Sequence, residues 1–207
     1  MESSLVPEVQ GASAATRGDL RQLVLVGPMR LIVGFGESRA YLDALTGLTR
    51  VPRAPHWLLG VFSSDGASVP LVDIDAWAHQ TRPAAWRYID SSGVSQFFNV
   101  RAGVTGAGGV GAATQLRALQ FGDGANAWAI RVSQAPAVVA LAAQQMQSIS
   151  NKLPLQVSAN NGRLMQYAEA AWALGDKAPA IEVRWSVLAQ ALRQELSGIS
   201  LAERRKE

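Results

Sequence analysis

Short apolar runs separated by turn residues recur along most of this chain. The runs at 23–26 and 30–33 flank Gly27 and Pro28, so they predict a β-hairpin. The runs at 58–62 and 69–74 flank a polar Ser-Ser-Asp-Gly turn and predict a second hairpin. Further strands are expected at 86–89, 96–100, 115–121, 127–132, 138–141 and 181–185. Short strands joined by tight turns indicate an all-β barrel or sandwich.

Other segments have less regular patterns. Residues 38–48 fit a strand or one irregular turn, and residues 142–149 fit a short helix. Asn161 and Gly162 form a strong tight-turn pair, so residues 163–174 are expected to pair as strands around Gly162, although their spacing also fits a helix. A helix is predicted over 186–199, where apolar side chains recur at helical spacing at Leu188, Leu192, Leu196 and Ile199.

The chain is expected to consist of a leader, one domain and a tail. Residues 1–19 are mostly small and polar, which is typical of a flexible segment. Residues 20–199 are expected to form the domain, with a long loop rich in Gly and Ser at about 78–113. Residues 200–207 are expected to form a solvated basic tail.

Composition excludes several classes of protein. The hydrophobic share of 48% supports a sizeable core, whereas a net charge of +3 without a dense Lys/Arg run does not suit a nucleic-acid backbone. The chain has no cysteine, so disulfides and thiolate metal sites are excluded. No secretory signal is evident, and the longest apolar run, 135–143, is far shorter than the roughly 20 residues of a membrane helix. We therefore expect a cytoplasmic protein that does not insert into a membrane.

The segment from Gly106 to Gly111 matches the pattern G-x-G-x-x-G. In a dinucleotide-binding fold these glycines turn a strand into a helix that faces the pyrophosphate. Here Gly122 follows too soon for a packing helix, and the acidic residue expected about 20 positions on is missing. A flexible loop is the favoured interpretation, and a nucleotide-binding protein or enzyme using this loop is the alternative.

Few side chains suggest a catalytic or metal site. The two histidines, His56 and His79, would need carboxylate partners such as Asp73 or Asp75 to bind a metal. The ligand spacing is missing, so we expect Asp73 and Asp75 to be an exposed pair on one face of a strand end. The chain has neither a G-x-S-x-G motif nor a cysteine nucleophile, and a Ser-His-Asp triad, which depends on geometry, stays open. No cofactor is expected.

An ordered set of motifs runs from residue 22 to residue 74. The hairpin sequence LVLVGPMRLIV is followed by V-P-x-A-P at 51–55. A longer motif then matches in register at Gly60, Val61, Phe62, Gly66, Pro70, Leu71, Val72, Asp73 and Ile74. Together these motifs resemble the CheW-like domain family, the adaptors of bacterial chemotaxis arrays. The residues that we expect to form its structural frame are Pro52, Pro55, Gly60, Pro70 and Asp73.

The resemblance implies a fold of two intertwined five-stranded SH3-like β-barrels with a C-terminal helix. It also implies a non-catalytic scaffold that links a CheA-type histidine kinase to chemoreceptor cytoplasmic tips, or that serves a related motility pathway. The C-terminal half matches the family only loosely, and the loop after Trp77 is much longer than usual.

One departure from the family falls on its partner-contact surface. The family has Asn-Leu-Arg where this chain has Ser63-Ser64-Asp65, and the family arginine belongs to that surface, so Asp65 reverses a charge. Trp57 would suit an interface if exposed, although burial in the core is favoured for it. The candidate protein-interaction residues are therefore Trp57, Ser63, Ser64, Asp65 and Gly66.

Overall fold

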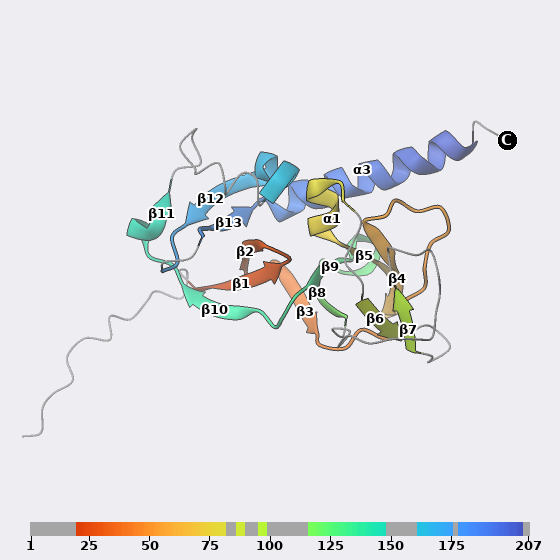
Figure 1. Ribbon diagram of the computed structural model, residues 1–207, viewed down its shortest axis with the longest axis horizontal. Helices are drawn as coiled ribbons and strands as arrows, with labels where there is room; N and C mark the ends of the chain where they lie inside the picture. Colours follow the sequence, from red (N-terminus) through yellow and green to blue (C-terminus); the bar gives the residue numbers. More distant parts are fainter. Residues whose placement is uncertain are drawn as a thin grey trace, which may run out of the picture.

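Two β-sheets and a long C-terminal helix make up most of the structure (Figure 1). The computed structural model describes residues 20–81, 116–147, 161–175 and 178–204, together with two short strands at 86–89 and 95–98. The leader 1–19, the segment from Gly106 to Gly111, residues 148–160 and the end of the basic tail lie outside these ranges.

The first sheet has six strands in the order β10-β1-β2-β13-β12-β11. Their bounds are β1 Leu20–Val26, β2 Met29–Gly34, β10 Ala137–Ala140, β11 Met146–Gln147, β12 Ala168–Trp172 and β13 Ala180–Val183. β13 and β2 are parallel, and the other neighbours are antiparallel. The N-terminal hairpin and the C-terminal strands therefore lie in one sheet.

The second sheet has five strands in the order β3-β8-β9-β5-β4. Their bounds are β3 Ser38–Leu42, β4 Leu58–Ser64, β5 Ala67–Val72, β8 Arg117–Phe121 and β9 Trp128–Val132. A separate antiparallel hairpin pairs β6, Trp86–Ile89, with β7, Ser95–Phe98. The chain thus leaves the first sheet after β2, builds the second, and returns to the first at β10.

The segment after β3 forms hydrogen bonds beside β8 and then with β4, the last strand of the second sheet. Leu45 N donates to Leu116 O beside β8, at 3.0 Å. Thr49 then pairs with Val61 of β4 through two backbone hydrogen bonds of 2.7 and 2.8 Å. This stretch of chain therefore provides the edge strand β4 with hydrogen-bond partners.

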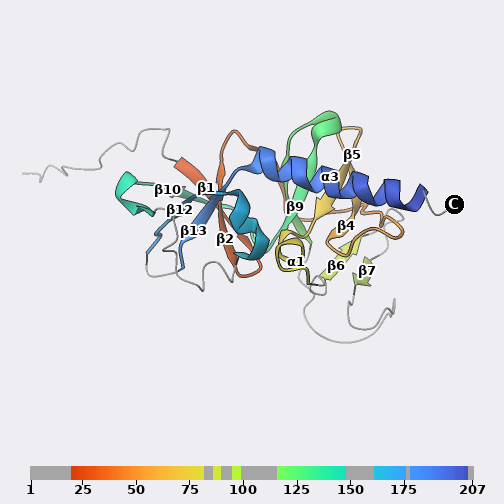
Figure 2. The ribbon, with the colours of Figure 1, turned by 90° about the horizontal axis from the view of Figure 1, so that it is seen from above.

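The helices lie between and across the sheets. α1 spans Ile74–His79 and α3 spans Trp185–Arg204. The described ranges also contain the short 3₁₀ helices η2 Gly124–Asn126, η3 Ala143–Gln145 and η4 Gly162–Tyr167. α3 leaves the first sheet after β13 and crosses over the second when viewed from above (Figure 2). No helix in the described ranges is long and apolar enough to cross a membrane.

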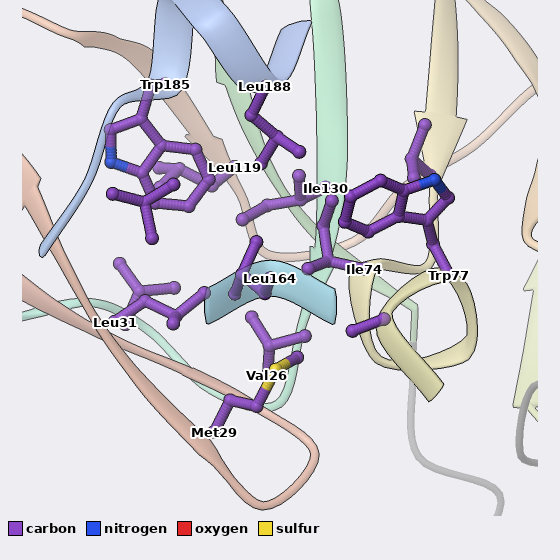
Figure 3. Close-up of a cluster of buried hydrophobic side chains, with 14 of the residues drawn as sticks. Val26, Met29, Leu31, Ile74, Trp77, Leu119, Ile130, Leu164, Trp185 and Leu188 are labelled. Atoms are coloured by element: carbon purple, nitrogen blue, oxygen red, sulfur yellow. The ribbon is translucent and has the colours of Figure 1, made fainter. Parts of the chain in front are cut away.

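One hydrophobic core joins the two sheets. Side chains from both sheets, α1, η4 and α3 converge in it, as Figure 3 shows for Leu31, Ile74, Ile130 and Leu164, which are all fully buried. Beside them the Trp185 ring lies 4.9 Å from that of Phe121, which in turn stacks on Trp128 at 4.8 Å. Burial of this apolar surface holds the sheets together.

The predicted fold class is confirmed, with local corrections. The second sheet has five strands, and the first has five plus the two-residue β11. The predicted strand 69–74 ends at Val72, because Asp73 caps a helix. The predicted strand pair around Gly162 is wrong, since 162–167 form η4 and only β12 follows. The expected helix at 142–149 is reduced to η3 before β11, and α3 extends to Arg204.

Candidate protein-interaction surfaces

The turn between β4 and β5 has the geometry that its sequence predicts. Ser64 pairs with Ala67, which leaves Asp65 and Gly66 as a two-residue loop. Both have positive φ, 49° at Asp65 and 77° at Gly66, as a type I′ turn requires. Asp-Gly is a preferred pair for this turn, because neither residue pays a large steric cost there. The turn therefore holds Asp65 and Ser63 at the surface.

Asp65 is paired with an arginine of its own chain. Arg39 Nη2 on β3 lies 2.8 Å from Asp65 Oδ2, and Arg39 Nη1 lies 3.7 Å from Asp123 Oδ2 in the β8–β9 turn. The side chains of Asp65 and Asp123 are 71% and 81% exposed. We call Arg39, Ser63, Asp65, Gly66 and Asp123 the turn cluster. The guanidinium of Arg39 thus lies beside Asp65, the residue that stands where CheW-like domains have an arginine.

Ser64 and Trp57 have structural positions instead. The Ser64 hydroxyl donates to Gln120 Oε1 at 3.0 Å, which satisfies an amide that is only 2% exposed. The Trp57 side chain is 5% exposed and belongs to the core between the sheets. Neither side chain is therefore part of the turn cluster.

Asp73 is not the exposed strand-end residue that we expected. Its side chain is fully buried, and Oδ1 accepts a hydrogen bond from Ala76 N at 3.1 Å, which caps α1. Oδ2 lies 2.9 Å from Arg131 Nη2 on β9. Burial raises the pKa of the Asp73 carboxyl above its ordinary value, and Arg131 acts against that rise. The prediction failed because the chain turns into a helix at Ile74.

The remaining metal candidates do not assemble into a site. Asp75 Oδ1 lies 2.9 Å from His79 Nδ1 one turn along α1, whereas His56 is exposed in the segment before β4. Among the residues that the structure describes, no cluster of three or more potential ligands could hold a metal ion. The glycine-rich segment from Gly106 to Gly111 lies outside the described residues, so its role stays a sequence-based prediction.

A second surface, at β10, was missed in the sequence. β10 is an edge strand of the first sheet and pairs only with β1 among the described strands. Ala137, Val138 and Ala140 are exposed, Val138 by 64%, and β10 contains no charge. Phe35, 48% exposed, follows Gly34, and the strand register places it at the same end of the sheet as Ala140. We call Phe35, Ala137, Val138 and Ala140 the edge patch.

The sequence contained one signal for the edge patch. Phe35 lies between Gly34 and Gly36 in a turn, where a large apolar side chain has little chance of burial. The apolar run at 138–141 predicted a strand but not its exposure, because a strand's position in the sheet order cannot be deduced from its own residues.

Comparisons with known proteins support the fold. No protein-family model matches the chain, and no curated protein matches it in sequence. Its structure is similar to the crystal structure of the scaffolding protein TtCheW from Thermoanaerobacter tengcongensis, with a TM-score of 0.53 and 10% sequence identity. The match covers 84% of this chain and 90% of that one. The chain therefore has the fold of the CheW-type scaffolding proteins, in a divergent form, as the motifs in 22–74 predicted.

Proposed function

We propose that this protein is a cytoplasmic, non-catalytic adaptor of bacterial chemotaxis-type signal transduction. It would couple a CheA-type histidine kinase to receptors, or serve a related motility pathway. The observation that carries the proposal is the CheW-like fold over 84% of the chain. An adaptor needs no reacting groups, but it needs surfaces that bind partners, and the structure contains two candidates.

The edge patch has the properties of a docking surface. A strand edge presents unpaired N–H and C=O groups, and proteins usually protect such edges with charges, bulges or a covering segment. β10 has no charged residue, and its Val138 side chain is 64% exposed. Burying such a side chain against a partner excludes water and stabilises the complex. We assign kinase binding to this surface.

The turn cluster would then adjust partner choice. Asp65 and Asp123 outnumber Arg39, so the cluster carries a net negative charge. It favours a partner with basic groups and disfavours an acidic one that an arginine at position 65 would attract. A protein with this cluster does not simply replace an ordinary CheW.

Val138→Asp is expected to weaken binding to the regulatory domain of a CheA-type kinase by about tenfold or more, because it places a charge in the apolar contact. Isothermal titration calorimetry with the purified domain measures the effect. Val187→Asp is the matched control, since Val187 is also an exposed valine, 40% exposed, but lies on α3. Equal binding by both variants and the wild type would contradict the assignment of the edge patch.

Asp65→Arg is expected to strengthen binding to the same kinase domain by up to about tenfold at low salt, with a smaller gain at high salt. Asp65→Asn separates charge from backbone effects, because asparagine also tolerates positive φ. Asp65→Asn should change the free energy of unfolding by less than about 1 kcal/mol, since the Arg39 pair is exposed. Asp65→Arg should lose about 1 kcal/mol more, because arginine does not favour the positive φ at this position. If the wild type binds as tightly as an ordinary CheW and Asp65→Arg changes nothing, the charge argument is wrong.

A further inference from the structure

Three residues far apart in the sequence form a polar network where the helices meet. Arg163 of η4 and Glu195 of α3 pair through both guanidinium Nη atoms, each 3.2 Å from a carboxylate oxygen. The Trp77 Nε1–H of α1 donates to the same carboxylate at 3.2 and 3.3 Å. Arg163 Nε also donates to Trp77 O at 2.8 Å. Glu195 therefore accepts bonds from two elements, and Arg163 binds two elements.

The Arg163 guanidinium also lies over the ring of Trp77. Its Cζ is 3.9 Å from the indole centroid, within the range of a cation–π contact. The ring centroid of Tyr167, also on η4, lies 5.7 Å from that of Trp77. The Trp77 side chain is consequently enclosed by η4 and α3.

The backbones of α1 and η4 are in very close contact. A Cβ on Gly162 would lie 2.5 Å from Ala78 O, so only glycine allows this approach. Such a contact depends on exact placement of η4, because it leaves no space for small shifts. The position of η4 therefore depends on the bonds that Arg163 makes with Glu195 and with Trp77 O.

Exposure differs sharply within the network. Trp77 is fully buried, whereas the Arg163 and Glu195 side chains are 28% and 37% exposed. The anchor residues of η4 and α3, Leu164 and Leu188, are fully buried in the core. Water and salt can therefore reach the ion pair while the apolar core stays closed.

We propose that Trp77, Arg163 and Glu195 form a salt-sensitive lock that closes η4 and α3 over α1. The lock opens locally, without unfolding of the sheets, when the Arg163–Glu195 pair is lost or screened. Because α1 directly follows β5, the lock also connects the β4–β5 hairpin, which carries Asp65, to η4 and α3, which precede β12 and follow β13. This proposal concerns the isolated protein and does not depend on its partners.

Hydrogen exchange followed by mass spectrometry on the full-length chain tests the lock. Glu195→Gln keeps the side-chain shape and removes the charge, and Arg163→Lys keeps the charge and removes the paired geometry. Each variant is expected to speed exchange of the amides in α1 and η4 by about tenfold, because hydrogen bonds to charged groups are lost. Amides of β8 and β9 should exchange at the wild-type rate. Glu169→Gln, at an exposed position on β12, is the matched control and should change neither region.

The dependence of hydrogen exchange on salt concentration provides a second test of the lock. At about 1 M NaCl the screening length is near 3 Å, so wild-type α1 and η4 should exchange faster while Glu195→Gln responds little. Unchanged exchange of α1 and η4 in both lock variants would overturn the proposal. So would an equal increase in β8 and β9, since that indicates general destabilisation. A kinase-binding experiment is not involved, so failure of the lock leaves the proposed adaptor function separately testable.

Discussion

Asp73→Ala is expected to lower the free energy of unfolding by about 3 kcal/mol, as measured by urea denaturation at pH 7. The substitution removes the oxygen that accepts from Ala76 N at the start of α1. It also removes the carboxylate 2.9 Å from Arg131 Nη2, in a region where Arg131 is only 18% exposed. Loss of a helix cap costs about 1 kcal/mol, and breaking a buried ion pair costs more, because one charge stays behind.

Asp73→Asn separates these two contributions. Its amide oxygen can still cap α1, so this variant should lose less stability than Asp73→Ala. An equal loss in the two variants would show that capping is not what Asp73 contributes. A loss below about 0.5 kcal/mol in Asp73→Ala would contradict the whole argument, since that is the size of an ordinary surface effect.

The difference in stability between the wild type and Asp73→Asn should depend on pH. Burial raises the pKa of Asp73 in the folded state, so the folded protein favours the protonated form. The part of the stability that comes from this difference in pKa is complete below the unfolded pKa of about 3.9 and is lost as the pH rises through the folded pKa. The helix cap and the contact with Arg131 are separate contributions. The stability of the wild type relative to Asp73→Asn should therefore fall as the pH rises above the unfolded pKa of Asp73.

Gly60→Ala is expected to lower the free energy of unfolding by about 3 kcal/mol, because strain and overlap add. Gly60 has φ +154°, and an added Cβ would lie 2.5 Å from Thr49 O. That carbonyl accepts from Val61 N, so the methyl group would push apart the bridge that pairs the edge of β4. Thermal and urea denaturation of the purified variant measure the loss.

Gly66→Ala is the matched control for Gly60→Ala. Gly66 also has positive φ, +77°, but no atom lies within 4 Å of an added Cβ. Only the backbone cost of about 1 kcal/mol should appear. Similar losses at positions 60 and 66 would show that backbone conformation, and not the contact with Thr49, explains the glycine at position 60.

Local sequence chemistry predicted the strands and turns well. The Gly27-Pro28 and Asp65-Gly66 turns both lie where the sequence places them, because positive φ and restricted φ are properties of single residues. Strand positions followed from apolar runs between such turns, usually within two residues of the observed bounds. α1 was missed because six residues are too few to show a helical period, although Asp73 is a standard capping residue.

The candidate site was predicted only in part. The turn at Asp65 was found, because it interrupts a motif that the rest of the segment keeps. Its pairing with Arg39 and Asp123 was not, since those residues come from other strands that approach only in the folded sheet. The edge patch was missed for the same reason: exposure of Val138 depends on β10 being last in its sheet.

By itself the sequence determined the β-rich class, the hairpins, the C-terminal helix and the resemblance to CheW-like domains. These features depend on the backbone preferences of single residues and on the periodic spacing of apolar side chains, and both can be seen in short stretches of sequence. The tertiary structure alone decided the sheet order, the burial of Asp73, the partner of Asp65, the edge patch and the network around Trp77. Each of these depends on contacts between segments distant in the sequence, and such contacts are set by packing of the whole core.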